Sequence, residues 1–187
     1  EERYGHISDW DVSSMTNMSQ LFEHQITFND DISRWDVSNV TTMYCMFNGA
    51  SSFNRDVGDW DVSNVTDMQG MFRGAWDFNQ DVGNWDVSKV TNMGYMFYRA
   101  YVFNRAIGNW NVSNVTNMQG MFCDARSFNQ DVGNWNVSRV TTMFGVFCGA
   151  HSLNQDLTRW DVASLNDKSY MFHCAADMPV AKRPLGC

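Results

Sequence analysis

Proline is nearly absent from this chain of 187 residues, which contains two prolines, Pro179 and Pro184. Both lie in the C-terminal tail, roughly 176–187, which is the one candidate linker of the chain. No run of about 18 consecutive apolar residues occurs, so we expect no membrane insertion. Basic residues are also scarce, with 13 Lys and Arg against 21 Asp and Glu and a net charge of -8. Because nucleic-acid binding requires a basic surface, we expect no nucleic-acid partner.

Groups of residues suited to catalysis are missing as well. The four histidines lie near the two ends of the chain, at His6, His24, His151 and His173. None has a Ser, Cys or carboxylate partner at a repeated spacing, so neither a catalytic triad nor a zinc site can be drawn. We therefore predict that the chain is not an enzyme and has no catalytic residues, no cofactor and no metal site.

The chain consists mainly of one sequence motif that is repeated many times. Residues 78–97 read FNQDVGNWDVSKVTNMGYMF, and residues 128–147 differ from them at few positions. Tryptophan recurs with a constant step of 25 residues, at Trp10, Trp35, Trp60, Trp85, Trp110, Trp135 and Trp160. A period of this length is typical of solenoids, in which each unit buries its apolar face against its neighbours. We predict a single solenoid of seven 25-residue repeats over 1–176, followed by a C-terminal tail or cap over 177–187.

The apolar spacing within one repeat predicts two short elements. Residues 90–100 place apolar side chains at Val90, Met93, Met96, Phe97 and Ala100, a spacing that favours one face of a helix. Upstream, residues 84–88 alternate polar and apolar, which favours a half-buried strand. The predicted fold class is therefore an α/β repeat solenoid with one short parallel strand and one short helix per repeat, and with the tryptophans facing inward.

Three polar residue types also recur at fixed positions of the repeat. The asparagine column predicts a ladder that ties the backbone of each coil to the next. Aspartates fill two further columns, where they suit either turn capping or calcium binding between coils. A threonine column suggests helix caps, with ice or mineral binding by a flat polar array as an outside alternative. The members are Asn29, Asn54, Asn79, Asn104, Asn129 and Asn154; Asp31, Asp56, Asp81, Asp131 and Asp156; Asp36, Asp61, Asp86 and Asp161; and Thr16, Thr41, Thr66, Thr91, Thr116 and Thr141.

The repeated phrase F-N-x-D-V-x-x-W-D-V-S-x-V-T-x-M-x-x-M-F-x-x-A resembles a known bacterial motif. It looks like the 25- to 26-residue surface-protein repeat of Mycoplasma and Listeria lipoproteins, and like the wider BspA-type leucine-rich-repeat family. The resemblance covers 1–176. It implies a right-handed, leucine-rich-repeat-like stack of coils that is extracellular or cell-surface, non-enzymatic, and used in adhesion or ligand binding.

Five cysteines leave two readings open. Cys123 and Cys148 share a position in adjacent coils, within the usual reach of a disulfide, and Cys174 and Cys187 are placed to fasten the tail to the last coil. Cys45 then remains unpaired, because the number is odd. The alternative is five free thiols in a reducing compartment.

The positions that vary between repeats are where we look for binding specificity. Aromatic and arginine side chains, which are enriched at the centres of interfaces, gather in two neighbouring registers of the middle coils. They are Arg73, Trp76, Tyr98, Arg99, Tyr101 and Arg126. We expect them to bind a protein or glycan partner at the cell surface. The alternative is a structural spacer or assembly subunit that packs end to end, or against other subunits, through its open ends.

Overall fold

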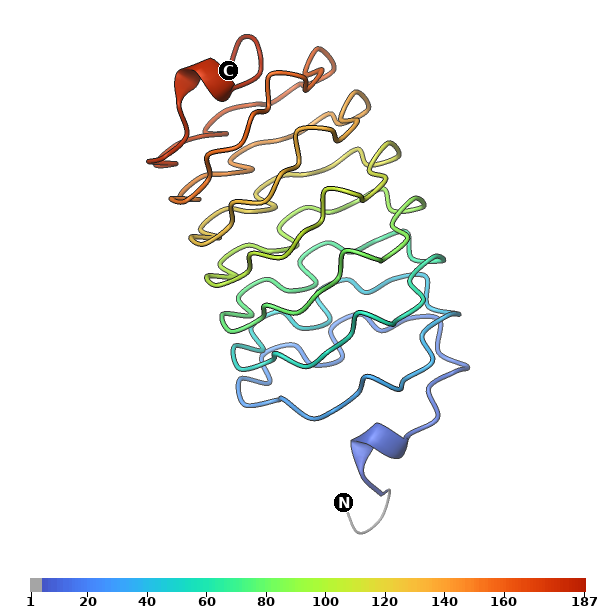
Figure 1. The fold of residues 1–187 in the computed structure, drawn as a ribbon. Helices are drawn as coiled ribbons and strands as arrows, with labels where there is room; N and C mark the ends of the chain where they lie inside the picture. Colours follow the sequence, from blue (N-terminus) through green and yellow to red (C-terminus); the bar gives the residue numbers. More distant parts are fainter. Residues whose placement is uncertain (1–4) are drawn as a thin grey trace.

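The computed structural model describes residues 5–187, which wind into a stack of similar coils with the chain ends at opposite ends of the stack (Figure 1). Two short 3-10 helices lie near these ends, η1 at Ile7–Asp9 and η2 at Val180–Lys182. The β pairing among the described residues consists of isolated parallel bridges at a 25-residue step. They join Asn17 to Thr42, Thr42 to Asp67, Asp67 to Asn92, Asn92 to Asn117, Asn117 to Thr142 and Thr142 to Asp167.

The predicted α/β solenoid, with a strand and a helix in every repeat, is wrong. Residues 5–187 contain no α-helix and no β-strand. Within 90–100, the N–H groups of Met93 and Tyr95 donate to carbonyl oxygens of the next coil, at 2.9 and 2.7 Å, whereas Met96 donates back to Met93 at 3.2 Å. An α-helix needs every N–H to bond four residues back, so this alternation produces successive turns instead.

Backbone angles in the same segment explain why a helix cannot form. Tyr95 and Arg99 have φ values of 57° and 56°, in the left-handed region, whereas an α-helix requires about -63°. Glycine occupies the same two registers in other coils, also at positive φ: Gly70, Gly120 and Gly145 in the first, and Gly49, Gly74 and Gly149 in the second. These glycines, inside the expected helix, were the sequence signal for turns.

Turns also replace the strand expected at 84–88. The carboxylate of Asp81 accepts the N–H of Gly83 at 2.9 Å, and that of Asp86 accepts the N–H of Ser88 at 3.0 Å. Such side-chain turns bend the chain on both sides of Trp85. The aspartate columns therefore shape turns, which was one of the two roles considered for them.

The columns of apolar residues are buried as predicted, although the predicted helices and strands do not form. Val90, Met93, Met96, Phe97 and Ala100 are all fully buried. Rings of the phenylalanine columns stack along the axis of the coil stack, with centroids 5.4–6.1 Å apart between adjacent coils at most steps. The inward position predicted for the tryptophan column is confirmed for Trp35, Trp60, Trp85, Trp110, Trp135 and Trp160, which are at most 4% exposed. It is wrong for Trp10, which is 45% exposed because it lies in the first coil, where no preceding coil covers it.

Polar columns hold adjacent coils in register. The Oδ1 atom of Asn79 accepts the backbone N–H of Asn104 at 3.0 Å, and the same bond recurs at each step from Asn29 to Asn154. The predicted asparagine ladder is confirmed, with side chains that are mostly half-buried. Thr91 bonds the carbonyl of Thr66 through both its N–H and its hydroxyl, so the threonines join coils and are not helix caps.

Residues beyond the repeats pack on the last coil. The N–H of Leu157 donates to the carbonyl of Lys182 at 2.9 Å, and the guanidinium of Arg183 lies over the ring of Phe172, 5.1 Å from its centroid. This contact covers part of the apolar face that a further coil would cover. No helix among residues 5–187 has the length and apolar content to cross a membrane.

Candidate functional site

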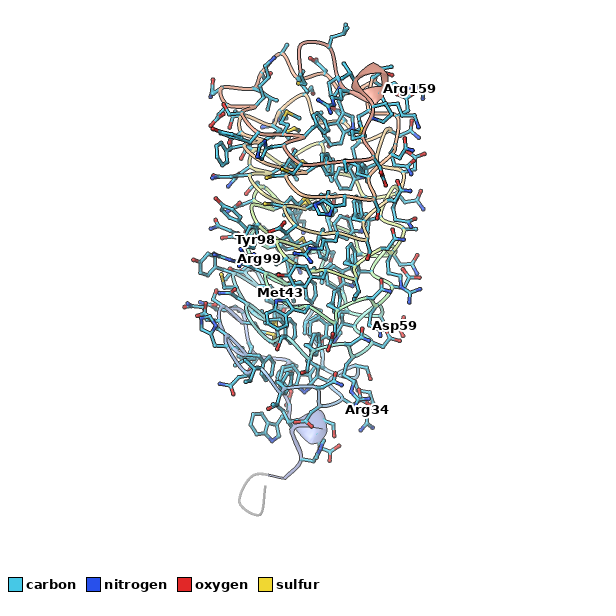
Figure 2. All side chains as sticks on the ribbon, turned by 90° about the vertical axis from the view of Figure 1, so that its left-hand side faces the viewer. Arg34, Met43, Asp59, Tyr98, Arg99 and Arg159 are labelled. Atoms are coloured by element: carbon cyan, nitrogen blue, oxygen red, sulfur yellow. The ribbon has the colours of Figure 1, made fainter. Side chains whose placement is uncertain are left out.

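The six residues predicted to bind a partner lie together on one side of the stack. Tyr98 and Arg99 are at the left of the view in Figure 2, whereas Asp59 is at the right. Their registers become neighbours because each coil repeats the path of the previous one 25 residues later. We call this set the aromatic–arginine patch: Arg73, Trp76, Tyr98, Arg99, Tyr101 and Arg126.

Each arginine of the patch lies over an aromatic ring. The Cζ atom of Arg73 is 5.2 Å from the ring centroid of Tyr98, that of Arg99 is 5.1 Å from the same centroid, and that of Arg126 is 4.7 Å from the centroid of Tyr101. These are cation–π distances, which hold a guanidinium in place without neutralising it. Arg99 also pairs with the carboxylate of Asp124 at 3.5 Å.

One member of the aromatic–arginine patch is an exposed tryptophan. Trp76 is 50% exposed, and its ring centroid is 5.9 Å from that of Tyr101, with the two planes tilted by 31°. The column tryptophans from Trp35 to Trp160 are almost completely buried, and Trp10 is exposed at the open end of the stack, so Trp76 is the tryptophan exposed on the side of the stack among the described residues. Exposed large aromatics on a folded surface mark interaction sites.

A shallow groove of about 210 Å³ adjoins Trp76. We call it the glycine groove, because Gly49 and Gly74 line it at φ values of +72° and +67° and contribute no side chains. In the same register the coils on either side carry His24 and Arg99. The groove therefore exists where two successive coils have glycine between two bulky residues. Its lining is Ile26, Asn48, Gly49, Ser51, Arg73, Gly74, Trp76, Tyr98 and Arg99.

Sequence reasoning missed part of this lining. Ile26, Asn48 and Ser51 occupy the two registers of the aromatic–arginine patch, but in the first two coils, where these registers hold no aromatic or arginine residue. Gly49 and Gly74 were the available signal, since consecutive glycines in one register leave a gap in a side-chain column. Tyr101 and Arg126, which were predicted, lie beside the groove and do not line it.

The polar groups of the groove are partly engaged already. The N–H groups of Gly49 and Gly74 donate to carbonyls of the next coil, both at 2.7 Å. The Nδ2 atom of Asn48 donates to Glu23 at 2.6 Å, and the Ser51 hydroxyl donates to the carbonyl of Ile26 at 3.2 Å. The side-chain Oδ1 of Asn48 and the lone pairs of the Ser51 hydroxyl therefore remain as acceptors on two residues that line the groove.

The five cysteines are free thiols in the structure, so neither candidate disulfide is formed. Burial, and then the neighbouring thiol of Cys148, raises the pKa of Cys123 to about 12. Burial also raises the pKa of Cys187, whose sulfur contacts that of Met171 at 3.7 Å and makes no bond to Cys174. Raised pKa values keep these thiols protonated and poorly nucleophilic.

Comparison with known proteins gives a family but no activity. The chain matches the family DUF285, described as a Mycoplasma protein of unknown function, over residues 1–106 and 75–181. No curated protein and no solved structure matches it. The expected kinship with a Mycoplasma protein family is confirmed at this level. Because the two matched segments together span most of the chain, the protein belongs to the DUF285 family.

Proposed function

We propose that this chain is a non-enzymatic binding module of the cell surface, which captures a macromolecular partner, protein or glycan, through the aromatic–arginine patch. The observation that carries the proposal is the half-exposed Trp76 beside Tyr101, on a scaffold that buries its column tryptophans from Trp35 to Trp160. Tryptophan, tyrosine and arginine are the residue types that dominate the energy of interfaces.

Charge supports the same site. The chain carries a net charge of -8, yet the patch brings together three guanidinium groups, of which one, Arg99, has a carboxylate partner. A positive patch on an acidic protein steers anionic partners toward one face and repels them from the rest. The extracellular location and the finer kinship with BspA-type adhesive repeats are part of this proposal, on the strength of the repeated motif.

The test removes the two exposed rings and measures partner capture. We expect the variant Trp76→Ser with Tyr101→Ser to fold, because both side chains lie at the surface, and to lose capture of partners from a host-surface extract. The matched control is Phe144→Ser with Tyr170→Ser, a second exposed ring pair whose centroids are 5.5 Å apart. No arginine lies over that pair among the contacts of the described residues.

The two variants decide between the functions considered. Loss of capture in the first and retention in the control supports the patch. Unchanged capture by a folded patch variant overturns the proposal and favours the spacer or assembly role. Circular dichroism and urea denaturation of both variants establish that each is folded.

A further inference from the structure

We propose that the glycine groove takes a single carboxylate-bearing sugar ring of an acidic glycan; this inference rests on the proposed function of the aromatic–arginine patch and names its ligand chemistry. The chemistry is a pyranose ring with one apolar face, several hydroxyl groups and one carboxylate. Hexuronates have this chemistry. The apolar face, the hydroxyl groups and the carboxylate each have a complementary group among the residues that line the groove.

The size of the groove restricts the ligand to one ring. Its volume of about 210 Å³ is below the roughly 300–1,000 Å³ of pockets that enclose drug-sized molecules. Along the axis of the stack its lining runs from Ile26 to Arg99, with Gly49 and Gly74 in the two coils between them. A longer glycan chain would therefore insert one ring and continue over the surface.

Apolar side chains form one wall. Trp76 is 50% exposed and Ile26 is 62% exposed, and both occupy the same register. The face of an indole carries partial negative charge, so it attracts the partially positive C–H groups on the apolar face of a pyranose ring. Tyr101 packs against Trp76 from outside the groove and limits its rotation.

Arginines form the other wall and the end of the groove. Arg73 lies over the rings of Tyr95 and Tyr98, at 5.6 and 5.2 Å, and it has no carboxylate partner among the described residues. Two aromatic contacts restrict the guanidinium and leave its N–H groups for a ligand, and a carboxylate is the group that they bind in bidentate fashion. Arg99 is already paired with Asp124, so Arg73 is the principal anion-binding residue.

The hydrogen-bonding pattern favours a sugar over a peptide. Peptides that add to a protein edge need exposed backbone N–H and C=O groups. Here the N–H groups of Gly49 and Gly74 are used between coils. The acceptors that remain, on Asn48 and Ser51, suit the hydroxyl donors of a sugar.

The experiment is a titration of the ¹⁵N-labelled protein, followed by the indole N–H resonance of Trp76, which a Trp76→Phe spectrum assigns. Three probes are compared: methyl glucuronide, methyl glucoside and an acetylated glutamate tetrapeptide. We expect the glucuronide to bind with a millimolar Kd, as befits a ligand of this size, and at least about tenfold more tightly than the other two.

Two variants assign the parts of the groove. Arg73→Gln should weaken glucuronide binding at least about tenfold and leave the glucoside nearly unchanged, because it removes the anion-binding group alone. Gly74→Asn should weaken both sugars by filling the groove. A Cβ atom at Gly74 would meet only atoms of Gly49, at 3.6 Å, and asparagine tolerates positive φ, so folding is expected. Gly145→Asn, at φ +59° and away from the groove, is the matched control.

Every outcome bears on the proposal. Tighter glucuronide binding, lost in Arg73→Gln and Gly74→Asn but kept in Gly145→Asn, supports it. Equal binding of glucoside and glucuronide, preferential binding of the tetrapeptide, or full binding by Gly74→Asn overturns it. If no probe binds while Trp76 and Tyr101 remain necessary for partner capture, the sugar proposal fails and the proposed function stands.

Discussion

The indole Nε1 of Trp85 donates a hydrogen bond to the carbonyl oxygen of Val57, 28 residues earlier, at 3.0 Å. Both groups lie in the interior, where an unpaired polar atom is costly. The same relationship joins each column tryptophan from Trp35 to Trp160 to a carbonyl of the chain 28 residues before it. The tryptophan column therefore fills the core and also fixes how far one coil is turned relative to the next.

Replacing Trp85 by phenylalanine should separate these two roles. The ring stack is kept, but the carbonyl of Val57 loses its donor, so we expect a loss of about 1–3 kcal/mol in the free energy of unfolding. Trp85→Ala should cost about 3–5 kcal/mol, because it also leaves a cavity. Urea denaturation followed by circular dichroism measures both. The control is Trp76→Phe, at an exposed site, for which we expect a change within about 0.5 kcal/mol.

We expect the loss of an asparagine from the middle of the ladder to cost more unfolding free energy than the loss of the asparagine at its end. Asn79→Ala removes the acceptor of the Asn104 N–H, and we expect a loss of about 1–3 kcal/mol in unfolding free energy. Asn154→Ala is the matched control, since that side chain is exposed and accepts from the flexible Lys182 ammonium. Its cost should be within about 0.5 kcal/mol. Equal costs at the two positions would contradict the ladder as a stabilising feature.

Acid should weaken the turns made by the second aspartate column. Hydrogen bonds from the Ser38, Ser63 and Ser88 hydroxyls, and then from the backbone N–H groups of the same serines, lower the pKa values of Asp36, Asp61 and Asp86. A pKa below that of the unfolded chain means that the stabilisation is complete above about pH 4 and is lost as the pH falls through the folded-state value.

The triple variant with asparagine at these three aspartates tests this pH dependence. Coils five and six already use Asn111 and Asn136 in the same turn, so we expect the variant to fold at pH 7. Its urea midpoint should fall less than that of the parent chain between pH 5 and pH 3. The reverse change, Asn111→Asp, should steepen the fall. Parallel pH profiles for all three proteins would rule out these carboxylates as the acid-sensitive groups.

The cysteines should differ in reactivity. Because burial and the adjacent thiol raise the pKa of Cys123 to about 12, little thiolate forms there at pH 8. Cys174 is exposed, so iodoacetamide should label it well before Cys123, as peptide mass spectrometry would show. Unfolding in urea provides the control, since it should bring the two rates together. Labelling of Cys123 as fast as Cys174 in the folded protein would contradict the buried environment.

The sequence predicted what lies inside the fold but not the path of the backbone. Met93, Met96 and Phe97 have helical spacing, and all three are buried. The same spacing also fits tandem turns, because each turn advances the chain by a few residues and returns it to the same face. The positive φ angles of Tyr95 and Arg99 exclude a helix and produce turns. A positive φ is uncommon for residues other than glycine, so the sequence of this coil does not indicate it. Only comparison with Gly70 and Gly74, one coil earlier, reveals it.

The candidate site was predictable to the extent that it depends on register. Trp76 and Tyr101 differ by one 25-residue step, so stacking alone places them side by side. The packing of Arg73 over Tyr95 was not predictable, because it requires the turn that directs the Tyr95 ring outward. The groove exists because Gly49 and Gly74 have no side chains, and a glycine carries no chemical group that would indicate a binding site.

Among residues 5–187, the backbone hydrogen bonds that join coils connect each coil only to its immediate neighbours, at steps close to 25 residues. Duplicating or deleting one whole unit in the gene would therefore rebuild every such bond at the new junction, with no change elsewhere. A chain built in this way can change its length in discrete steps of one unit. Each step would move the glycine groove nearer to or farther from one end of the stack, so the length of the stack can change without any change in the lining of the groove.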